Sequence, residues 1–421
     1  MSEFILKDKK YVWHPFTQAA TAIDNIVILS GKDALLFDEN GKSYIDAVSS
    51  WWTNIHGHCN PYITQKIYEQ LQTLEHVIFA DCTHPQAIRL SERIIEIFEH
   101  HFAKVFFSDN GSTAVEVALK MALQYWHNTG KPRQKILAFE GAYHGDTFGA
   151  MSVGARSSFT EPFNSLMFEV IHLPLPTQNN IQLIKNEINI LGNRVAAFIY
   201  EPLLQGAAGM RTYDSLLLNE ILMELKKNKV LCIADEILTG FYRTGALFAS
   251  SFMHEKPDII CLSKAITGGF FPLGLTLCTA EIYEAFYDND YKKTFFHGHS
   301  YTANPSICAA ANASLDLTLN ESIQANIYNI NKQHISFCET LKNIKNVENI
   351  RVLGTLLAFE IQQKESGYFS NIAPKIKAYF YGKGIMLRPL GNTIYILPPY
   401  CIKNTELQYI YNEIINFLNT I

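Results

Sequence analysis

The sequence predicts an α/β protein in which a mainly parallel sheet lies between helices, joined to a smaller α/β domain. Five short apolar runs rich in Val, Ile and Phe each stop abruptly at a polar or glycine-rich cluster, at residues 104–107, 135–139, 195–200, 230–234 and 259–262. Runs of this length and composition are typical of strands that are buried on both faces. Amphipathic stretches separate several of them, and strand–helix alternation favours a parallel sheet.

The two ends of the chain follow a different pattern. Residues 306–345 have helical periodicity, strand-like pieces follow at 350–354, 356–361 and 393–397, and an amphipathic helix is expected near 406–418. Near the start, the turn signal Glu39-Asn40-Gly41 lies between two apolar runs and predicts a hairpin. We therefore expect a large domain at residues 48–305 and a small domain formed by residues 1–47 and 306–421.

Composition excludes several classes of protein. The 421 residues exceed what one hydrophobic core usually holds, and 48% apolar with 18% charged residues indicates a globular chain rather than a disordered one. The formal net charge of −5 shows no basic excess of the kind that nucleic-acid or membrane-surface proteins carry. No apolar run is long enough to span a bilayer.

The expected compartment is the cytoplasm. The first ten residues lack the apolar core and cleavage site of a secretory signal. The eight cysteines form no Cys-x-x-Cys pair, and such sparse thiols are typical of a reducing environment rather than of a disulfide framework or a zinc ribbon.

A candidate phosphate cradle follows the first apolar run. Gly111, Ser112 and Thr113 stand where a strand gives way to a helix, and Thr113 with Glu116 is expected to form a capping box. Unpaired N–H groups and the positive end of the helix dipole suit a phosphate at such a place. The alternative is an ordinary capped helix. The segment is neither a Walker A loop nor a G-x-G-x-x-G motif, which disfavours nucleotide binding.

An acid and a lysine end two later runs. Asp235 closes one apolar run and Lys264 closes the next, 29 residues on, which is about the length of one βαβ unit. A lysine at such a place can form a Schiff base, and a carboxylate can keep a ring nitrogen protonated. Together with a phosphate cradle these groups fit pyridoxal 5′-phosphate, and Tyr143 offers a ring to stack on the pyridine. Singly, each residue is more often a solvated charge or part of a structural ion pair.

At this point the sequence resembles the class III aminotransferases of the fold type I pyridoxal-phosphate family. The similarity covers about residues 10–400, and it is carried by FFSDNGSTAVEVALKMA, EPLLQGAAGM, ADEILTGFYRTG and CLSKAITGGFFPLG. The resemblance implies Lys264 as the Schiff-base lysine that also moves the proton, and Asp235 as the partner of the pyridine nitrogen. It further implies Tyr143 as the stacking ring, with Gly111 and Ser112 at the phosphate.

The same resemblance implies a homodimer with shared active sites. Ser300, in the segment Gly298-His299-Ser300, is then expected to reach the phosphate bound by the partner subunit. Glu201 and Arg243 match family positions near the site, and we expect supporting roles for them.

A narrower resemblance lies outside these central motifs. WHPFTQ at residues 13–18, SWWTNIHGH at 50–58, GDTFGAMSV at 145–153 and LRP at 387–389 are similar to a subfamily that aminates 8-amino-7-oxononanoate in biotin biosynthesis, with S-adenosylmethionine as its usual donor. Aromatic walls and a bidentate arginine suit a long keto-amine that ends in a carboxylate. The expected substrate-binding residues are Phe16, Trp51, Trp52, Gly298 and Arg388.

Two residues depart from the usual pattern of that subfamily. Phe16 stands where a tyrosine is usual, so a hydrogen bond from that position is lost while the aromatic wall remains. Gly298-His299-Ser300 stands where Gly-Pro-Thr is also common, and Ser300 keeps the hydroxyl.

The same residues fit other functions less well. The pairs His56/His58 and His297/His299 have spacing that a metal could use on a strand, but no nearby carboxylate or cysteine completes a ligand set, so no metal is expected. A semialdehyde aminomutase or another ω-aminotransferase that uses lysine would share the same lysine and fold. A cofactor-free binding protein on this scaffold would not need Lys264 and Asp235.

Overall fold

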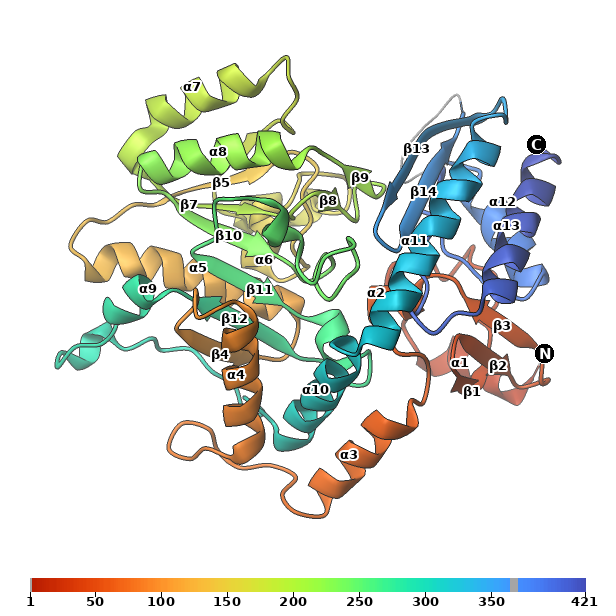
Figure 1. Cartoon of the computed structure of the whole chain (residues 1–421), viewed down its shortest axis with the longest axis horizontal. Helices are drawn as coiled ribbons and strands as arrows, with labels where there is room; N and C mark the ends of the chain where they lie inside the picture. Colours follow the sequence, from red (N-terminus) through yellow and green to blue (C-terminus); the bar gives the residue numbers. More distant parts are fainter. Residues whose placement is uncertain (1, 364–369) are drawn as a thin grey trace.

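The computed structural model describes residues 2–363 and 370–421, and within them a seven-stranded sheet forms the centre of the larger half of the molecule (Figure 1). Neighbouring strands are parallel except that β12 runs antiparallel to both β11 and β4. The order across the sheet is β4 (Lys104–Ser108), β12 (Gly274–Cys278), β11 (Ile259–Leu262), β10 (Leu231–Asp235), β7 (Val195–Tyr200), β5 (Lys135–Phe139) and β6 (Val170–Leu173).

The sheet confirms the predicted fold class, and all five predicted strands lie in it. The sequence analysis did not identify β6 and β12. β12 contains Gly274, where a Cβ atom would lie 2.3 Å from the carbonyl oxygen of Asn110. The backbone of β12 therefore passes close to the loop that precedes α5 (Gly111–Asn128), and a glycine is needed at this point. Periodicity alone does not reveal such an approach.

Helices cover both faces of the sheet (Figure 1). One face packs against α5 (Gly111–Asn128), and Ala138, Ile199 and Ile233 point into that core. The opposite face sends Phe139, Phe198 and alternate residues of the other strands into the second core. Helices α4 (Pro85–Ile97), α7 (Ile181–Leu191), α8 (Ser215–Lys227) and α10 (Pro305–Thr318) contribute to that core. Burial on both faces explains why the strands are continuous apolar runs.

The smaller half joins the two ends of the chain. One sheet has the order β1 (Ile28–Lys32), β2 (Leu35–Asp38), β3 (Ser43–Asp46) and β15 (Ile385–Met386), so the N-terminal strands pair with a C-terminal one. A second sheet consists of β13 (Val347–Leu353), β14 (Leu356–Ile361) and β16 (Thr393–Ile396). Helices α11 (Glu321–Leu341), α12 (Ala373–Gly382) and α13 (Asn404–Leu418) complete this half.

The predicted hairpin near the start is confirmed. β2 and β3 pair antiparallel, and Gly41 between them has φ +79°, a conformation that glycine adopts without steric cost. The domain boundaries at 47/48 and 305/306 remain our proposal. Helix α10 lies just beyond the second boundary and packs against α3 (Pro61–Leu71) and α4 of the larger half. Residues 364–369, inside the proposed small domain, lie outside the described residues.

The remaining elements are short connections. They are α1 (Glu3–Tyr11), α2 (Ser49–Trp52), α6 (Phe148–Val153), α9 (Ala280–Glu284), β8 (Leu204–Gln205), β9 (Arg211–Thr212), and the 3-10 turns η1 (Glu161–Leu166), η2 (Gly192–Arg194), η3 (Ala249–Phe252), η4 (Lys264–Thr267) and η5 (Tyr291–Lys293). Among the helices of the described residues, none is both long and apolar enough to pass through a membrane.

Candidate active site at the carboxyl ends of the strands

Asp235 and Lys264 lie at the same edge of the large sheet. Strands β10 and β11 are parallel neighbours, and Asp235 is in register with Cys261, so the residues that follow both strands meet there. Lys264 opens η4 with φ +47°, a left-handed conformation that is strained for a residue with a Cβ. Burial lowers the pKa of the Lys264 amine, against the opposing attraction of Asp235 and Glu201. The neutral, nucleophilic form of this amine is thereby favoured.

His144 fixes the Asp235 carboxylate, and the sequence analysis had not assigned it a role. Nδ1 of His144 lies 2.7 Å from Oδ2 of Asp235, and the N–H of Ile237 donates to Oδ1 at 3.1 Å. Because a carboxylate only accepts, His144 carries its proton on Nδ1. Both side chains are buried. No sequence signal paired His144 with Asp235, although it directly follows Tyr143 in the chain.

Glu201 anchors the loop that carries Tyr143. Its Oε1 accepts the N–H of Tyr143 at 3.1 Å, and its Oε2 accepts the N–H of Gly206 at 3.0 Å. Burial raises the pKa of the Glu201 carboxyl to about 7. The Tyr143 hydroxyl donates to Oδ2 of Asp146 at 3.1 Å. Burial raises the pKa of the Tyr143 hydroxyl. Glu201 therefore positions a backbone loop beside Asp235.

The expected capping box at Thr113 and Glu116 is wrong. Helix α5 begins at Gly111, so Asn110 is its N-cap. The Asn110 side chain accepts the N–H of Thr113 at 3.0 Å, and Thr113 Oγ1 accepts the N–H of Asn110 at 3.1 Å. Glu116 instead accepts the hydroxyl of Thr147 at 2.6 Å and the N–H of Gly149 at 2.7 Å, which caps α6. The Glu116 side chain, which the local pattern assigned to the capping box of α5, is therefore used in a tertiary contact with α6.

Close packing around the start of α5 leaves no space for a side chain at positions 111 and 145, and both are glycines. A Cβ atom on Gly111 would lie 2.9 Å from the side chain of Ile237, and one on Gly145 would lie 2.0 Å from Oγ of Ser112. Ser112 Oγ also accepts the N–H of Asp146 at 3.3 Å. The helix N-terminus, a serine hydroxyl and two glycines thus form a cradle suited to an anion.

The two adjacent tryptophans connect this edge of the sheet to the smaller half. Trp52 is buried, its ring centroid lies 5.0 Å from Nζ of Lys264, and its Nε1–H donates to the hydroxyl of Tyr395 at 3.0 Å. The ring centroid of Trp51 lies 4.2 Å from Cζ of Arg388, and Phe16 meets Trp51 edge-on at 5.5 Å. The structure therefore places Phe16 and Arg388 against Trp51, and Lys264 against Trp52. The substrate-binding role of Phe16, Trp51, Trp52 and Arg388 stays a prediction.

Arg243 cross-links the chain around these tryptophans. It is fully buried, and its guanidinium donates to the carbonyl oxygens of Trp52 at 3.2 Å and Pro398 at 3.1 Å. Its own carbonyl oxygen accepts the N–H of Thr355 at 3.0 Å. Burial lowers the pKa of the guanidinium. Arg243 thus ties the larger half, the tryptophan segment and the smaller half together at one point.

Gly298 and Ser300 lie in an exposed segment after η5, and they do not meet Lys264 or Asp235 within the described chain. Nδ1 of His299 lies 3.2 Å from Oδ2 of Asp109, which draws the segment toward the start of α5. A Cβ on Gly298 would have no neighbour within 4 Å among the residues described. That Ser300 reaches the phosphate of a partner subunit stays a prediction.

The pairs His56/His58 and His297/His299, whose spacing a metal could use, include histidines with other partners. Nε2 of His56 lies 3.0 Å from the carbonyl oxygen of Ser314, and Nδ1 of His297 lies 2.9 Å from Nζ of Lys120. In residues 2–363 and 370–421 no group of three or more His, Cys, Asp or Glu side chains is placed to hold a metal ion.

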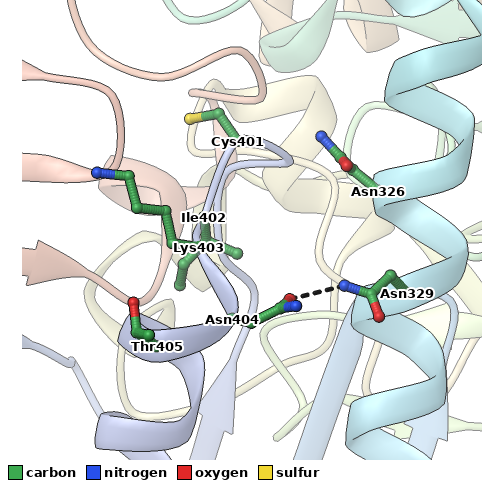
Figure 2. A pocket seen from close by; sticks show the side chains of 7 residues that line it. All are labelled: Asn326, Asn329, Cys401, Ile402, Lys403, Asn404 and Thr405. Atoms are coloured by element: carbon green, nitrogen blue, oxygen red, sulfur yellow. Dashed lines mark hydrogen bonds between the residues drawn. The ribbon is translucent and has the colours of Figure 1, made fainter.

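A separate pocket lies between α11 and the start of α13 (Figure 2). Asn329 donates to Asn404 across it at 2.7 Å. None of the candidate active-site residues is among those that line it, which are Asn326, Asn329, Cys401, Ile402, Lys403, Asn404 and Thr405.

Comparison with known proteins places this geometry in a family. The model of the class III aminotransferases matches residues 17–418. The adenosylmethionine-8-amino-7-oxononanoate aminotransferase of Synechococcus elongatus is 46% identical to this chain, over 98% of the chain and 99% of the relative.

Solved structures agree with the sequence comparison. The enzyme of the same name from Methanocaldococcus jannaschii has a TM-score of 0.95 at 34% identity, covering 99% of this chain and 98% of that one. A PLP-bound amine transaminase from an uncultivated Pseudomonas species has a TM-score of 0.90 at 29% identity, covering 96% of this chain and 97% of the other.

Proposed function

The chain belongs to the class III aminotransferases, and on that premise we propose that it converts 8-amino-7-oxononanoate to 7,8-diaminononanoate, as in biotin synthesis, with S-adenosylmethionine as the amino donor. One observation carries the choice of acceptor. Trp52 faces the Lys264 amine while its neighbour Trp51 stacks on the Arg388 guanidinium. Two adjacent tryptophans thus face the amine and a cation respectively, which suits an aliphatic keto-amine with a distant carboxylate.

The residues around Lys264 fit pyridoxal phosphate as the cofactor. The anion cradle at Gly111 and Ser112 would take its phosphate, Asp235 its ring nitrogen, Tyr143 its ring face, and Lys264 would hold it covalently. The fit depends on the glycines, since a Cβ on Gly111 or Gly145 would fill the cradle with contacts of 2.9 Å or less. When bound, the cofactor supplies an electron sink for the electron pair left when the substrate loses its α-proton.

The protein's own groups would then handle the proton. Lys264 is suited to accept the α-proton on Nζ and to return it, because burial lowers the pKa of its amine. Asp235, held in orientation by His144, would keep a positive charge on the ring nitrogen. Trp52 covers the lysine and helps exclude water from Nζ. The donor and acceptor would use the same site in turn, so ping-pong kinetics are expected.

A half-reaction screen tests the proposed substrates. Each candidate amine is mixed with the holoenzyme, and the absorbance change that accompanies amino transfer to the cofactor is recorded. S-adenosylmethionine is expected to react and 8-amino-7-oxononanoate to accept the amino group in the second half. Reaction with lysine but not with S-adenosylmethionine would overturn the donor assignment, and isomerisation without a separate donor would indicate an aminomutase.

Arg388→Ala is expected to impair the acceptor half-reaction selectively. Loss of a bidentate, charge-assisted contact to the far carboxylate should cost about 2–3 kcal/mol, or roughly 30- to 150-fold in kcat/KM for the keto-amine. The donor half should change much less, and Arg388→Lys should restore only part of the loss, because an ammonium lacks the planar fork. Stopped-flow measurement of both halves decides this. Equal losses in both would exclude a specific carboxylate role.

Homodimer formation, with Ser300 at the partner's phosphate, completes the proposal. Phe296 and Tyr301 flank Ser300 and are 60% and 61% exposed, which suits a surface that another subunit covers. Ser300→Ala is expected to leave the dimer intact and to weaken cofactor binding about tenfold, the effect of one hydrogen bond to a charged group. Cofactor titration with sedimentation analysis measures both. A monomeric variant, such as Phe296→Asp, that bound the cofactor as tightly as wild type would contradict the shared site.

A further inference from the structure

A left-handed turn at Ser49–Trp52 (α2) carries both tryptophans of the candidate site. The four residues have φ values of 50°, 45°, 69° and 73° in chain order. Left-handed backbone is disfavoured for residues with a Cβ, which crowds the following carbonyl oxygen. Four such residues in succession persist only where the surroundings fix them. In Figure 1, α2 lies at the junction between the two halves of the molecule.

Asp46 holds the turn from one side. Its side chain is fully buried, Oδ1 accepts the N–H of Ser50 at 2.9 Å, and Oδ2 accepts the hydroxyl of Ser50 at 2.7 Å. Nε2 of His58 lies 3.0 Å from the same Oδ2. Both hydrogen-bond donors of Ser50 are thus bound to one carboxylate, which fixes this residue within the turn.

The orientation of His58 follows from its other neighbours. The N–H of Gly57 donates to Oδ1 of Asn54 at 2.8 Å, so the Asn54 amide nitrogen is the atom that faces Nδ1 of His58, at 3.1 Å. Nδ1 must then accept, and the ring proton lies on Nε2, where it is donated to Asp46. An unbroken chain of hydrogen bonds therefore runs from Gly57 through Asn54 and His58 to Asp46.

The other side of the turn is held by groups from elsewhere in the fold. Arg243 donates to the carbonyl oxygen of Trp52 at 3.2 Å, and the hydroxyl of Ser49 donates to the carbonyl oxygen of Leu397 at 2.7 Å. Trp51 and Trp52 consequently project in set directions from a backbone that is bound on both sides. The Trp51 ring lies against the Arg388 guanidinium, and the Trp52 ring lies against the Lys264 amine.

We propose that Asp46 and His58 are positioning residues. They hold this turn rigid, and the rigid turn makes the enzyme select acceptors by the length of their aliphatic chain. The inference rests on the proposed function, in which the keto carbon reacts beside Lys264 and the carboxylate binds Arg388. A rigid turn between these two groups favours one number of methylene groups between keto carbon and carboxylate. A loosened turn lets the tryptophans and Arg388 shift, and then acceptors of other lengths are accommodated.

The test compares acceptors that differ by one methylene group. The kcat/KM is measured for 8-amino-7-oxononanoate and for its homologues one methylene shorter and one longer. In wild type we expect a preference of at least about tenfold, since a mismatched methylene costs roughly 10- to 200-fold. Asp46→Asn, His58→Gln and Ser50→Ala are expected to reduce that preference to less than about threefold.

A matched control separates positioning from general damage. Glu413→Gln alters another buried carboxylate, which accepts the Tyr379 hydroxyl at 2.8 Å in the smaller half. It is expected to keep the full length preference, even if stability falls. The near-ultraviolet circular dichroism of the tryptophans should change in the Asp46 and Ser50 variants and not in this control.

The possible outcomes are distinct. An unchanged length preference in Ser50→Ala, the mildest variant, would contradict the proposal that the turn selects acceptors by length, even if Asp46→Asn fails to fold. A uniform loss for all three acceptors would assign Asp46 a purely structural role and also overturn it. Failure of the wild-type enzyme to use 8-amino-7-oxononanoate would contradict the proposed function. In that case, unchanged dichroism in the Asp46 and Ser50 variants would independently contradict the positioning role.

Discussion

Replacing Lys264 by alanine is expected to lower transamination about 10⁴-fold or more while leaving the protein folded. The amine is buried at the edge of the sheet, and burial shifts its pKa downward, so it is suited both to covalent attachment of the cofactor and to proton transfer. General acid–base catalysis alone accounts for up to about 10⁴-fold. Alanine keeps a Cβ at φ +47°, so the backbone strain at this position is unchanged and the effect on stability should be modest.

Three measurements check this expectation. Borohydride reduction of the wild-type holoenzyme followed by peptide mapping should label Lys264, and a label on another lysine would disprove the assignment. Small primary amines added to Lys264→Ala should restore part of the proton transfer. Lys104→Ala, on β4 at the surface, serves as a control and should retain full activity. Substantial turnover by Lys264→Ala without added amine would mean that another group moves the proton.

Asp235→Asn is expected to lower kcat about 10²- to 10³-fold with a much smaller loss of cofactor affinity. The change nearly preserves shape but removes the negative charge that would stabilise a protonated ring nitrogen, and one such electrostatic contribution is typically of this size. His144 has its proton on Nδ1, 2.7 Å from the carboxylate. The neutral amide of asparagine could still accept that hydrogen bond, so the loss should reflect charge rather than a broken contact.

Asp258→Asn is the matched control for this change. Asp258 directly precedes the neighbouring strand β11, and its Oδ2 accepts the N–H of Cys232, near the start of β10, at 2.7 Å. If Asp235 acts through its charge at the cofactor, Asp258→Asn is expected to leave kcat near the wild-type value. Any effect of the control should be on stability alone. Steady-state kinetics and thermal unfolding of both variants make the comparison. Near-wild-type kcat for Asp235→Asn would show that another group holds the ring nitrogen.

The sequence alone determined five of the seven strands of the large sheet and placed Asp235 and Lys264 at the ends of two of them. Asp235 and Lys264 each follow an apolar run, and parallel neighbouring strands bring such positions to one edge. That argument needs only the length of the runs and the spacing between them. The anion cradle at Gly111 and Ser112 could be predicted for the same reason, because it follows the end of β4 directly.

The tertiary structure decided how these residues are oriented. No local period predicts the pairing of His144 with Asp235, the binding of Glu116 by Thr147 and Gly149, or the contact of Trp52 with Tyr395, 343 residues away. The left-handed turn at Ser49–Trp52 is the clearest case, since the intrinsic preferences of its residues oppose it. Local patterns specify helices and strands through their periodicity, whereas a strained turn exists only when distant groups such as Asp46, His58 and Arg243 are brought around it by packing.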